Sequence, residues 1–317
     1  MTSLLDRRPH RESSPPVSTQ LDEWTVAEIL KDKFVHKQSQ RDAVDTTFQL
    51  ENKAEATIEL SARFLAYVAE SSAMDQSTHA RIALLHNVFK YFTSTYLPTN
   101  DIHPPTSTFD TDTRKTVLSA YFLAIAALKA REIDASIPKQ EPTPLAAVLS
   151  KKASIFALFG GQGTNEVYFD ELQNLYDIYK PLVATFIQTL TEDVLASLVA
   201  EEKASTHYTF GLDVLSWFSG AAARPAVPYL ASFPISFPLI GLTQLVQYLI
   251  VCHVANLTPG ELRSRLAGAT GHSQGIVSAV VIAASGTLEE FVDNSRKAIK
   301  WLFYSGLIPA LRYGLRR

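Results

Sequence analysis

The sequence predicts an α/β protein in which a mainly helical N-terminal region precedes a core of alternating strands and helices. Apolar residues recur at helical spacing as far as residue 131. Beyond a proline-punctuated stretch, 137–144, short apolar runs that stop at glycine turns alternate with helical segments. One of these turns, Gly271-His272-Ser273-Gln274-Gly275, lies between an apolar run and a helix, so we expect the functional site there.

Composition sets the broad class of the protein. The chain has 317 residues, 46% of them hydrophobic and 19% charged, as in a soluble globular protein of one large or two ordinary domains. A formal net charge of -3 predicts no nucleic-acid partner. The single cysteine, Cys252, excludes an intrachain disulfide and lacks the spaced partners of a zinc site, so we expect no metal and a cytoplasmic protein.

Two segments are candidates for a membrane span or a secretory signal. Tyr229–Ala255 is the most apolar part of the chain, but Pro234 and Pro238 interrupt it, and the remainder is shorter than the ~20 residues that a bilayer needs. A buried core helix is therefore the prediction. The N-terminus mixes arginines with acidic residues and has no apolar run, so it is not a secretory signal.

The N-terminal half is expected to begin with a disordered segment, 1–22, because this segment is rich in Ser, Pro and Arg. Residues 23–150 are expected to form the helical region. Apolar side chains repeat at helical spacing in three segments, 57–68, 82–92 and 117–125, and prolines separate them.

The α/β core is expected over residues 151–304. A buried strand at Ser154–Phe159 ends at the glycine turn Gly160–Gly163, and a second apolar run, Leu266–Thr270, precedes the serine turn. Periodicity, caps and breakers predict five helices in this region: 168–179, 181–200, 238–255, 276–284, and a helix from the capping box Thr287–Glu290 to about Phe303.

The serine turn has the pattern of a nucleophile elbow, a serine with glycines two residues before and after it. A side chain at either Gly271 or Gly275 would clash with the neighbouring strand or helix, and Ser273 would project from the bend. The N–H of Gln274 and the helix dipole would then stabilise an oxyanion. The Gly160–Gly163 turn is a candidate for the second half of the oxyanion hole, although a phosphate cradle or a plain tight turn are alternatives.

A general base for Ser273 is the difficulty. We expect His272 to point away around the bend, His253 to be a core histidine with its polar groups satisfied, and His207 to be a surface residue. The other five histidines precede the α/β core. The sequence therefore assigns the base to no histidine of this chain.

Several motifs together carry a family resemblance. They are Phe159–Gly163, Pro234–Leu245, Leu257–Ser264 and Gly268–Gly275. Over about residues 20–304 the chain resembles the acyl-carrier-protein acyltransferases, most closely the N-terminal acetyltransferase domain of the fungal fatty acid synthase beta subunit. The resemblance implies an acyltransferase-like parallel-sheet core, cytoplasmic location, and partnership with an acyl carrier protein and the other fatty acid synthase subunits.

The resemblance also implies a mechanism. Ser273 would accept an acyl group from coenzyme A and pass it to the phosphopantetheine thiol of the carrier protein, with no bound cofactor. Gln162 and Gln274 would line the oxyanion hole, and Gly161, Gly163 and His272 would contact substrate. Malonyl-transferring relatives hold the substrate carboxylate with an arginine, which would fall near Ser305. Because Arg296 and Lys297 are expected on a solvated face, a neutral acyl group such as acetyl is favoured.

The last segment, 305–317, is expected to diverge from that family. The resemblance places the family's catalytic histidine beyond this segment, which implies a core that is incomplete at its C-terminus, has an exposed sheet edge, and supports impaired activity. Two alternatives stay open. The chain could be an inactive truncated fragment that serves in complex assembly, or, with weaker support, a serine hydrolase, which uses the same elbow.

Overall fold

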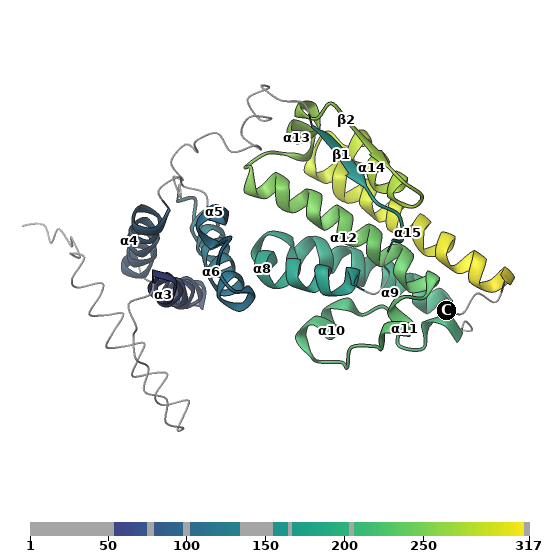
Figure 1. The fold of residues 1–317 in the computed structure, drawn as a ribbon, viewed down its shortest axis with the longest axis horizontal. Helices are drawn as coiled ribbons and strands as arrows, with labels where there is room; N and C mark the ends of the chain where they lie inside the picture. The colour runs from purple at the N-terminus through teal and green to yellow at the C-terminus, as the bar shows by residue number, and fades with distance from the viewer. Residues whose placement is uncertain are drawn as a thin grey trace, which may run out of the picture. The chain divides into compact units, whose positions relative to one another are not determined.

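The computed structural model describes residues 54–74, 79–97, 102–133, 155–163, 167–202 and 206–313. Residues 50–317 form one compact unit that is mostly helical and contains a small parallel sheet (Figure 1). The segments 1–22 and 137–144 lie outside the described residues. The expected disorder of the first and the expected domain division at about residue 150 therefore remain predictions.

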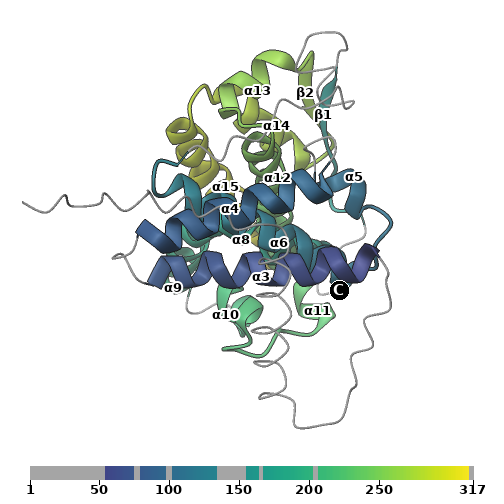
Figure 2. The same cartoon turned by 90° about the vertical axis from the view of Figure 1, so that its left-hand side faces the viewer.

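Among its described residues the N-terminal region contains four helices, and three of them confirm the expected helical segments. They are α3 (Ala54–Met74), α4 (His79–Tyr96), α5 (His103–Thr106) and α6 (Thr111–Lys129). Helix α3 packs against both α4 and α6 (Figure 2). Asp110 caps α6 by accepting hydrogen bonds from the N–H groups of Asp112 and Thr113, both at 3.0 Å. The unexpected α5 is a single turn that contains Pro104 and Pro105, where we expected only a break.

Helix α8 (Tyr168–Gln188) bends at Tyr179, whose φ of -109° and ψ of 19° are not helical. The bend separates the two helices that the sequence predicts on either side of Lys180. Pro181 explains it, because its ring has no N–H for the helical ladder and crowds the carbonyl four residues earlier. After α8 the chain forms a π-helical segment, η2 (Thr189–Leu195), and then α9 (Ala196–Glu201). Nothing in the sequence indicated the π-helical segment.

The bend in α8 is also where the N-terminal helices contact it. The ring of Phe122 in α6 lies 4.9 Å from that of Tyr179, centroid to centroid. His103 Nε2 lies 3.0 Å from the Tyr179 hydroxyl, and Lys115 forms an ion pair with Asp177. These contacts attach α6 to the first half of α8.

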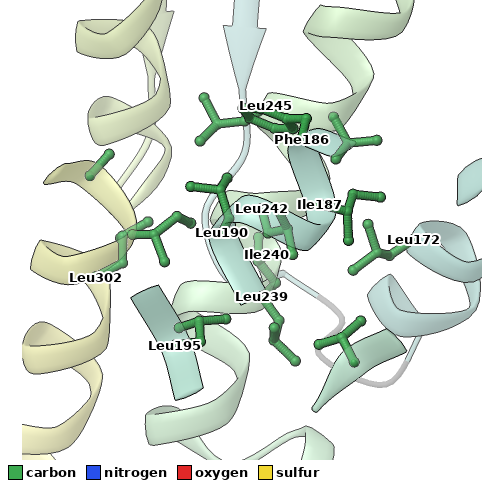
Figure 3. Close-up of a cluster of buried hydrophobic side chains, with 14 of the residues drawn as sticks. Leu172, Phe186, Ile187, Leu190, Leu195, Leu239, Ile240, Leu242, Leu245 and Leu302 are labelled. Carbon is green, nitrogen blue, oxygen red and sulfur yellow. The ribbon is translucent and has the colours of Figure 1, made fainter. Parts of the chain in front are cut away.

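Helix α12 (Phe233–Val254) is the central helix of the core. It begins five residues before the expected start at Pro238, because Pro234 occupies the first helical turn, where no N–H is needed. Its leucines meet side chains from α8, η2 and α15 in the cluster that Figure 3 shows. Three short helices precede it: η3 (Thr206–Tyr208), α10 (Val214–Ser219) and α11 (Val227–Leu230).

Two helical segments among the described residues are long and apolar enough to cross a membrane, namely 168–201 and α12. The most apolar window of α12 is 83% buried within the protein. Such burial fits the predicted core helix, because a helix that packs on most sides has no apolar face left for lipid.

The sheet pairs β1 (Phe156–Phe159) with β2 (Gly268–Gly271) in parallel, with Phe159 opposite Gly271. Helix α13 (Pro259–Arg265) leads into β2, and α14 (Gly275–Ala284) follows it. One face of the sheet packs on the core through Phe159 and Ala269. On the other face, Phe156 and Leu158 are 57% and 74% exposed. Within the described part of the chain the sheet has these two strands, so each strand has one edge without a partner strand.

The last helix, α15 (Leu288–Tyr313), is longer than expected, because it continues ten residues beyond Phe303. Its predicted capping box is confirmed. The N–H of Glu290 donates to Thr287 Oγ1 at 3.1 Å, and the Glu290 carboxylate accepts from the N–H groups of Gly286 and Thr287. The helix includes most of the segment 305–317.

Candidate active site

Ser273 occupies the bend between β2 and α14, as the elbow pattern predicts. Its φ of +53° lies in the left-handed region, which costs a residue with a Cβ about 1–2 kcal/mol. The bend passes directly into the helix, since the N–H of Gly275 donates to the carbonyl of His272 at 3.0 Å. Ser273 is exposed, and among the described residues its hydroxyl has no hydrogen-bond partner.

The two glycines of the elbow are required by close backbone approach, as the sequence predicts. A Cβ on Gly271 would lie 2.1 Å from the carbonyl carbon of Gly275. A Cβ on Gly275 would lie 2.3 Å from the carbonyl oxygen of Phe159, in β1. Both separations are far shorter than any non-bonded contact between heavy atoms. The bend therefore forms only where both positions lack a side chain.

The Gly160–Gly163 loop lies beside the bend, because the parallel pairing brings the ends of β1 and β2 together. The N–H of His272 donates to the carbonyl of Phe159 at 2.9 Å. A Cβ on Gly161 would lie 3.1 Å from Ser273 Cβ and 3.0 Å from His272 Nδ1. Within the described part of the chain, the N–H groups of Gly161 and Gln274 donate to no acceptor. At Gly163 the chain turns with a φ of +31°.

The two expected oxyanion-hole glutamines are held in different ways. Gln162 donates from Nε2 to the buried Ser236 hydroxyl at 3.0 Å, so its side chain is directed towards α12. Gln274 is 4% exposed, and both polar atoms of its side chain lack a partner among the described residues. Their backbone N–H groups, rather than these side chains, are therefore the groups suited to an oxyanion.

The histidines do not complete a nucleophile–base pair in the described part of the chain. His272 is exposed beside Gly161, and no hydrogen bond joins a histidine to Ser273. His253 is half-buried in the last turn of α12, where burial and the nearby Lys129 lower its pKa and favour the neutral ring. Among the described residues its ring has no hydrogen-bond partner, so the expectation of a satisfied core histidine stays a prediction. His207 is partly buried in η3 rather than fully at the surface.

Three polar residues that the sequence did not single out hold the loop. Gln244 of α12 donates from Nε2 to the Gly160 carbonyl at 2.8 Å and accepts from the Ser278 hydroxyl at 2.7 Å. Ser236 accepts from Gln162. The available signal was the presence of Ser236 and Gln244 inside an otherwise apolar helix.

A cavity of about 270 Å³ lies on the α12 side of the glycine loop. Its walls come from the end of β1, the loop, the start of α8 and one face of α12, including Gln162, Gln244 and Gln247. Ser273 does not line it. The cavity therefore borders the glycine loop without forming a pocket around the nucleophile.

Neither the cysteine thiol nor a metal site adds candidate chemistry in the described part of the chain. Cys252 is buried in α12, where burial raises the pKa of its thiol to about 12, so it stays protonated at neutral pH. Among the described residues, no group of three His, Cys, Asp or Glu side chains is arranged to hold a metal ion.

The unpartnered amide of Gln274 makes a testable prediction. A buried polar group without a hydrogen bond costs about 1–3 kcal/mol, so Gln274→Leu should raise the free energy of unfolding by up to that amount. Gln162→Leu is the matched control, because it removes a partnered amide and leaves the buried Ser236 hydroxyl without its donor, which should lower stability. Urea unfolding of both variants checks the pair. A Gln274→Leu protein less stable than the wild type would show that its amide is satisfied.

Two known families match this chain. Residues 7–128 match the family described as the N-terminal domain in fatty acid synthase subunit beta. Residues 157–312 match the family described as the starter unit:ACP transacylase in aflatoxin biosynthesis. The second match extends into the segment 305–317 that the sequence predicted to diverge, and it includes both the glycine loop and the elbow.

Three relatives show the extent of the similarity. Fatty acid synthase 2 of Mycosarcoma maydis is 36% identical over 96% of this chain and 8% of its own length. The fatty acid synthase subunit beta of Saccharomyces cerevisiae is 37% identical over 82% of this chain and 13% of its own. That of Schizosaccharomyces pombe is 34% identical over 93% of this chain and 14% of its own. The chain thus spans less than a sixth of the length of these relatives.

Proposed function

The chain belongs to the family of fungal fatty acid synthase beta subunits, whose N-terminal region it matches, and on that premise we propose that it carries an acyltransferase site with Ser273 as nucleophile. The observation that carries the proposal is the bend itself. A serine with a φ of +53° is held at a helix N-terminus, next to a glycine loop in which the Gly161 N–H donates to no acceptor among the described residues. Strained backbone of this kind clusters at functional sites.

The proposed reaction has two steps. In the first, the Ser273 oxygen attacks the thioester carbonyl of an acyl-coenzyme A, a serine ester forms, and coenzyme A leaves as its thiol. In the second, the phosphopantetheine thiol of an acyl carrier protein attacks the ester, takes the acyl group, and returns the proton to Ser273. Coenzyme A and phosphopantetheine are substrates here, and no resident cofactor takes part.

The oxyanion of each step would be stabilised by the backbone. The N–H of Gln274 is at the start of α14, where the helix dipole also favours negative charge. The loop around Gly161 and Gln162 would supply the second donor, since an oxyanion hole needs two converging N–H groups. Gly163 and His272 are proposed to contact the substrate at the edge of the site.

A neutral acyl group, such as acetyl, is the proposed cargo. Ser305, on α15, is not basic, and Arg296 is engaged at the surface with Asp193 and Asp293 at 3.4 and 3.5 Å. Lys297 is exposed. These observations favour a neutral acyl group over one that carries a malonyl carboxylate.

The proposed partners are an acyl carrier protein and the other subunits of a fatty acid synthase in the cytoplasm. The relatives are named as fatty acid synthases and as their beta subunits. A second function, in which the chain serves only in assembly of the complex, is favoured by one observation. Among the described residues, no base is hydrogen-bonded to the Ser273 hydroxyl.

Incubation of the chain with acetyl-labelled coenzyme A tests the proposal. We expect label on Ser273 that passes to an added acyl carrier protein, and a fall of about 10³-fold or more in labelling with Ser273→Ala. Ser264→Ala is the matched control, because this exposed serine lies on α13 and bonds only to its own helix.

Each other outcome has a definite meaning. Equal labelling of the wild type and Ser273→Ala would reject the nucleophile. An unlabelled wild type that still co-purifies with the carrier protein would favour the assembly function. Label that is lost as free acetate without any carrier protein would point to a hydrolase.

A further inference from the structure

The glycine loop is held against the elbow by two linked hydrogen bonds, one buried and one part-buried, that run through Gln244 of α12. The Ser278 hydroxyl in α14 donates to Gln244 Oε1 at 2.7 Å, and Gln244 Nε2 donates to the carbonyl of Gly160 at 2.8 Å. Ser278 and Gln244 are 1% and 8% exposed. These two bonds link the helix that follows the nucleophile to the loop that lies beside it.

The direction of both bonds is determined by the groups that they join. The Gly160 carbonyl can only accept, so the nitrogen of the Gln244 amide must face it. The oxygen of that amide then faces Ser278, whose hydroxyl must donate. The acceptor-only carbonyl thus fixes which way the Gln244 amide faces, and the Ser278 hydroxyl anchors that amide by donating to its oxygen. The anchored amide in turn holds the Gly160 carbonyl in place.

The orientation of that carbonyl matters for the site because of the peptide that contains it. In a planar trans peptide, the C=O of one residue and the N–H of the next point in opposite directions. With the Gly160 oxygen held by Gln244, the N–H of Gly161 is directed away from Gln244. Gly161 is the loop residue next to Ser273, and its N–H donates to no acceptor among the described residues.

We propose that Gln244 is a positioning residue for acyl transfer at Ser273, and that the hydrogen bond from Ser278 anchors it. Gln244 holds the Gly160–Gly161 peptide in the one orientation that turns the Gly161 N–H away from α12. The inference rests on the proposed acyltransferase function, but the geometry of the loop can be measured without it. The Gly160 carbonyl oxygen also packs closely against Gly275 of α14, where a Cβ added to Gly275 would have no room.

The test compares Gln244→Met with the wild type in the full chain. The methionine keeps the length of the side chain but loses both hydrogen bonds. We expect the rate constant for acetyl labelling of Ser273 to fall about 10- to 100-fold, while the acetyl-coenzyme A concentration at half-maximal rate is unchanged. Gln247→Leu is the matched control on the same helix, because Gln247 bonds to Glu171 and not to the loop.

A second variant separates positioning from general loss of structure. The carboxyl group in Gln244→Glu can replace the amide only when protonated, because a carboxylate would repel the Gly160 carbonyl oxygen. Its labelling rate, divided by that of the wild type at the same pH, should therefore rise as the pH falls through the titration of the buried carboxyl. A ratio that is independent of pH would overturn the proposal.

Hydrogen exchange distinguishes failure of this inference from failure of the proposed function. In Gln244→Met and Ser278→Ala, exchange of the His272 amide, which donates to the Phe159 carbonyl next to the loop, should become about tenfold faster or more, while α12 keeps its protection. Unchanged exchange of the His272 amide, or wild-type labelling by Gln244→Met, would overturn the inference. If the wild type takes no label, the proposed function fails for this chain, and exchange of the His272 amide alone decides whether Gln244 holds the loop.

Discussion

The substitution Gly275→Ala is expected to lower the free energy of unfolding by about 3 kcal/mol or more. The added Cβ would lie 2.3 and 2.4 Å from the carbonyl oxygens of Phe159 and Gly160. Neither oxygen can move freely, because one accepts from His272 in the elbow and the other from Gln244. The clash must therefore separate α14 from the end of β1. Urea unfolding, followed by far-UV circular dichroism, measures the loss.

Gly160→Ala is the matched control for that prediction. An ideal Cβ at Gly160 meets no heavy atom within 4 Å. The same substitution in the glycine loop should therefore change the free energy of unfolding by less than about 1 kcal/mol. Equal losses in the two variants would mean that the bend is not the tight contact that the structure describes. A Gly275→Ala protein that is as stable as the wild type would contradict the close contact between Gly275 and the end of β1.

Truncation of Phe291 is the second large effect, with an expected loss of about 3–5 kcal/mol for Phe291→Ala. This side chain at the start of α15 is fully buried. Its ring lies 5.5 Å from that of Phe186 in α8 and 5.7 Å from that of Tyr248 in α12. Phe291 thus joins three helices of the core, and its removal leaves a cavity that rigid helices cannot close.

Trp301→Ala on the same helix is the control for Phe291→Ala. Trp301 is the larger aromatic residue, but it is 57% exposed, so its loss should change stability by less than about 1 kcal/mol. Thermal or urea unfolding of the two variants side by side checks the contrast. A larger loss for Trp301→Ala would show that the outer face of α15 is covered by protein.

Local constraints explain what the sequence predicted well. The elbow was predictable because its Gly-x-Ser-x-Gly spacing is a local pattern, and Gly271 is required by its close contact with Gly275 four residues later. The contact that requires Gly275, with the end of β1, is not local. The amphipathic helices α3, α4 and α6, and the cap of α15 at Thr287, follow from spacing and side-chain chemistry alone. The bend of α8 was predictable for the same reason, because Pro181 acts on its own turn.

Features that depend on distant residues were not predictable. Gln244 contacts Gly160, 84 residues away in the chain, and Ser278, 34 residues away. No local pattern indicates such a pairing. The π-helical segment η2 was missed because its residues have ordinary helical preferences. The start of α12 was misplaced because Pro234 was interpreted as a breaker, although the first turn of a helix tolerates proline.

The pairing of β1 with β2 has a consequence for how the protein is made. More than one hundred residues separate Phe159 from its partner Gly271. At a synthesis rate of about 5–20 residues per second, the glycine loop leaves the ribosome several seconds before the serine bend exists. Helices α8 and α12 emerge in that interval, and a surface for β2 can assemble before β2 arrives. The nucleophile therefore takes its place only after the loop beside it and the central helix α12 have been synthesised.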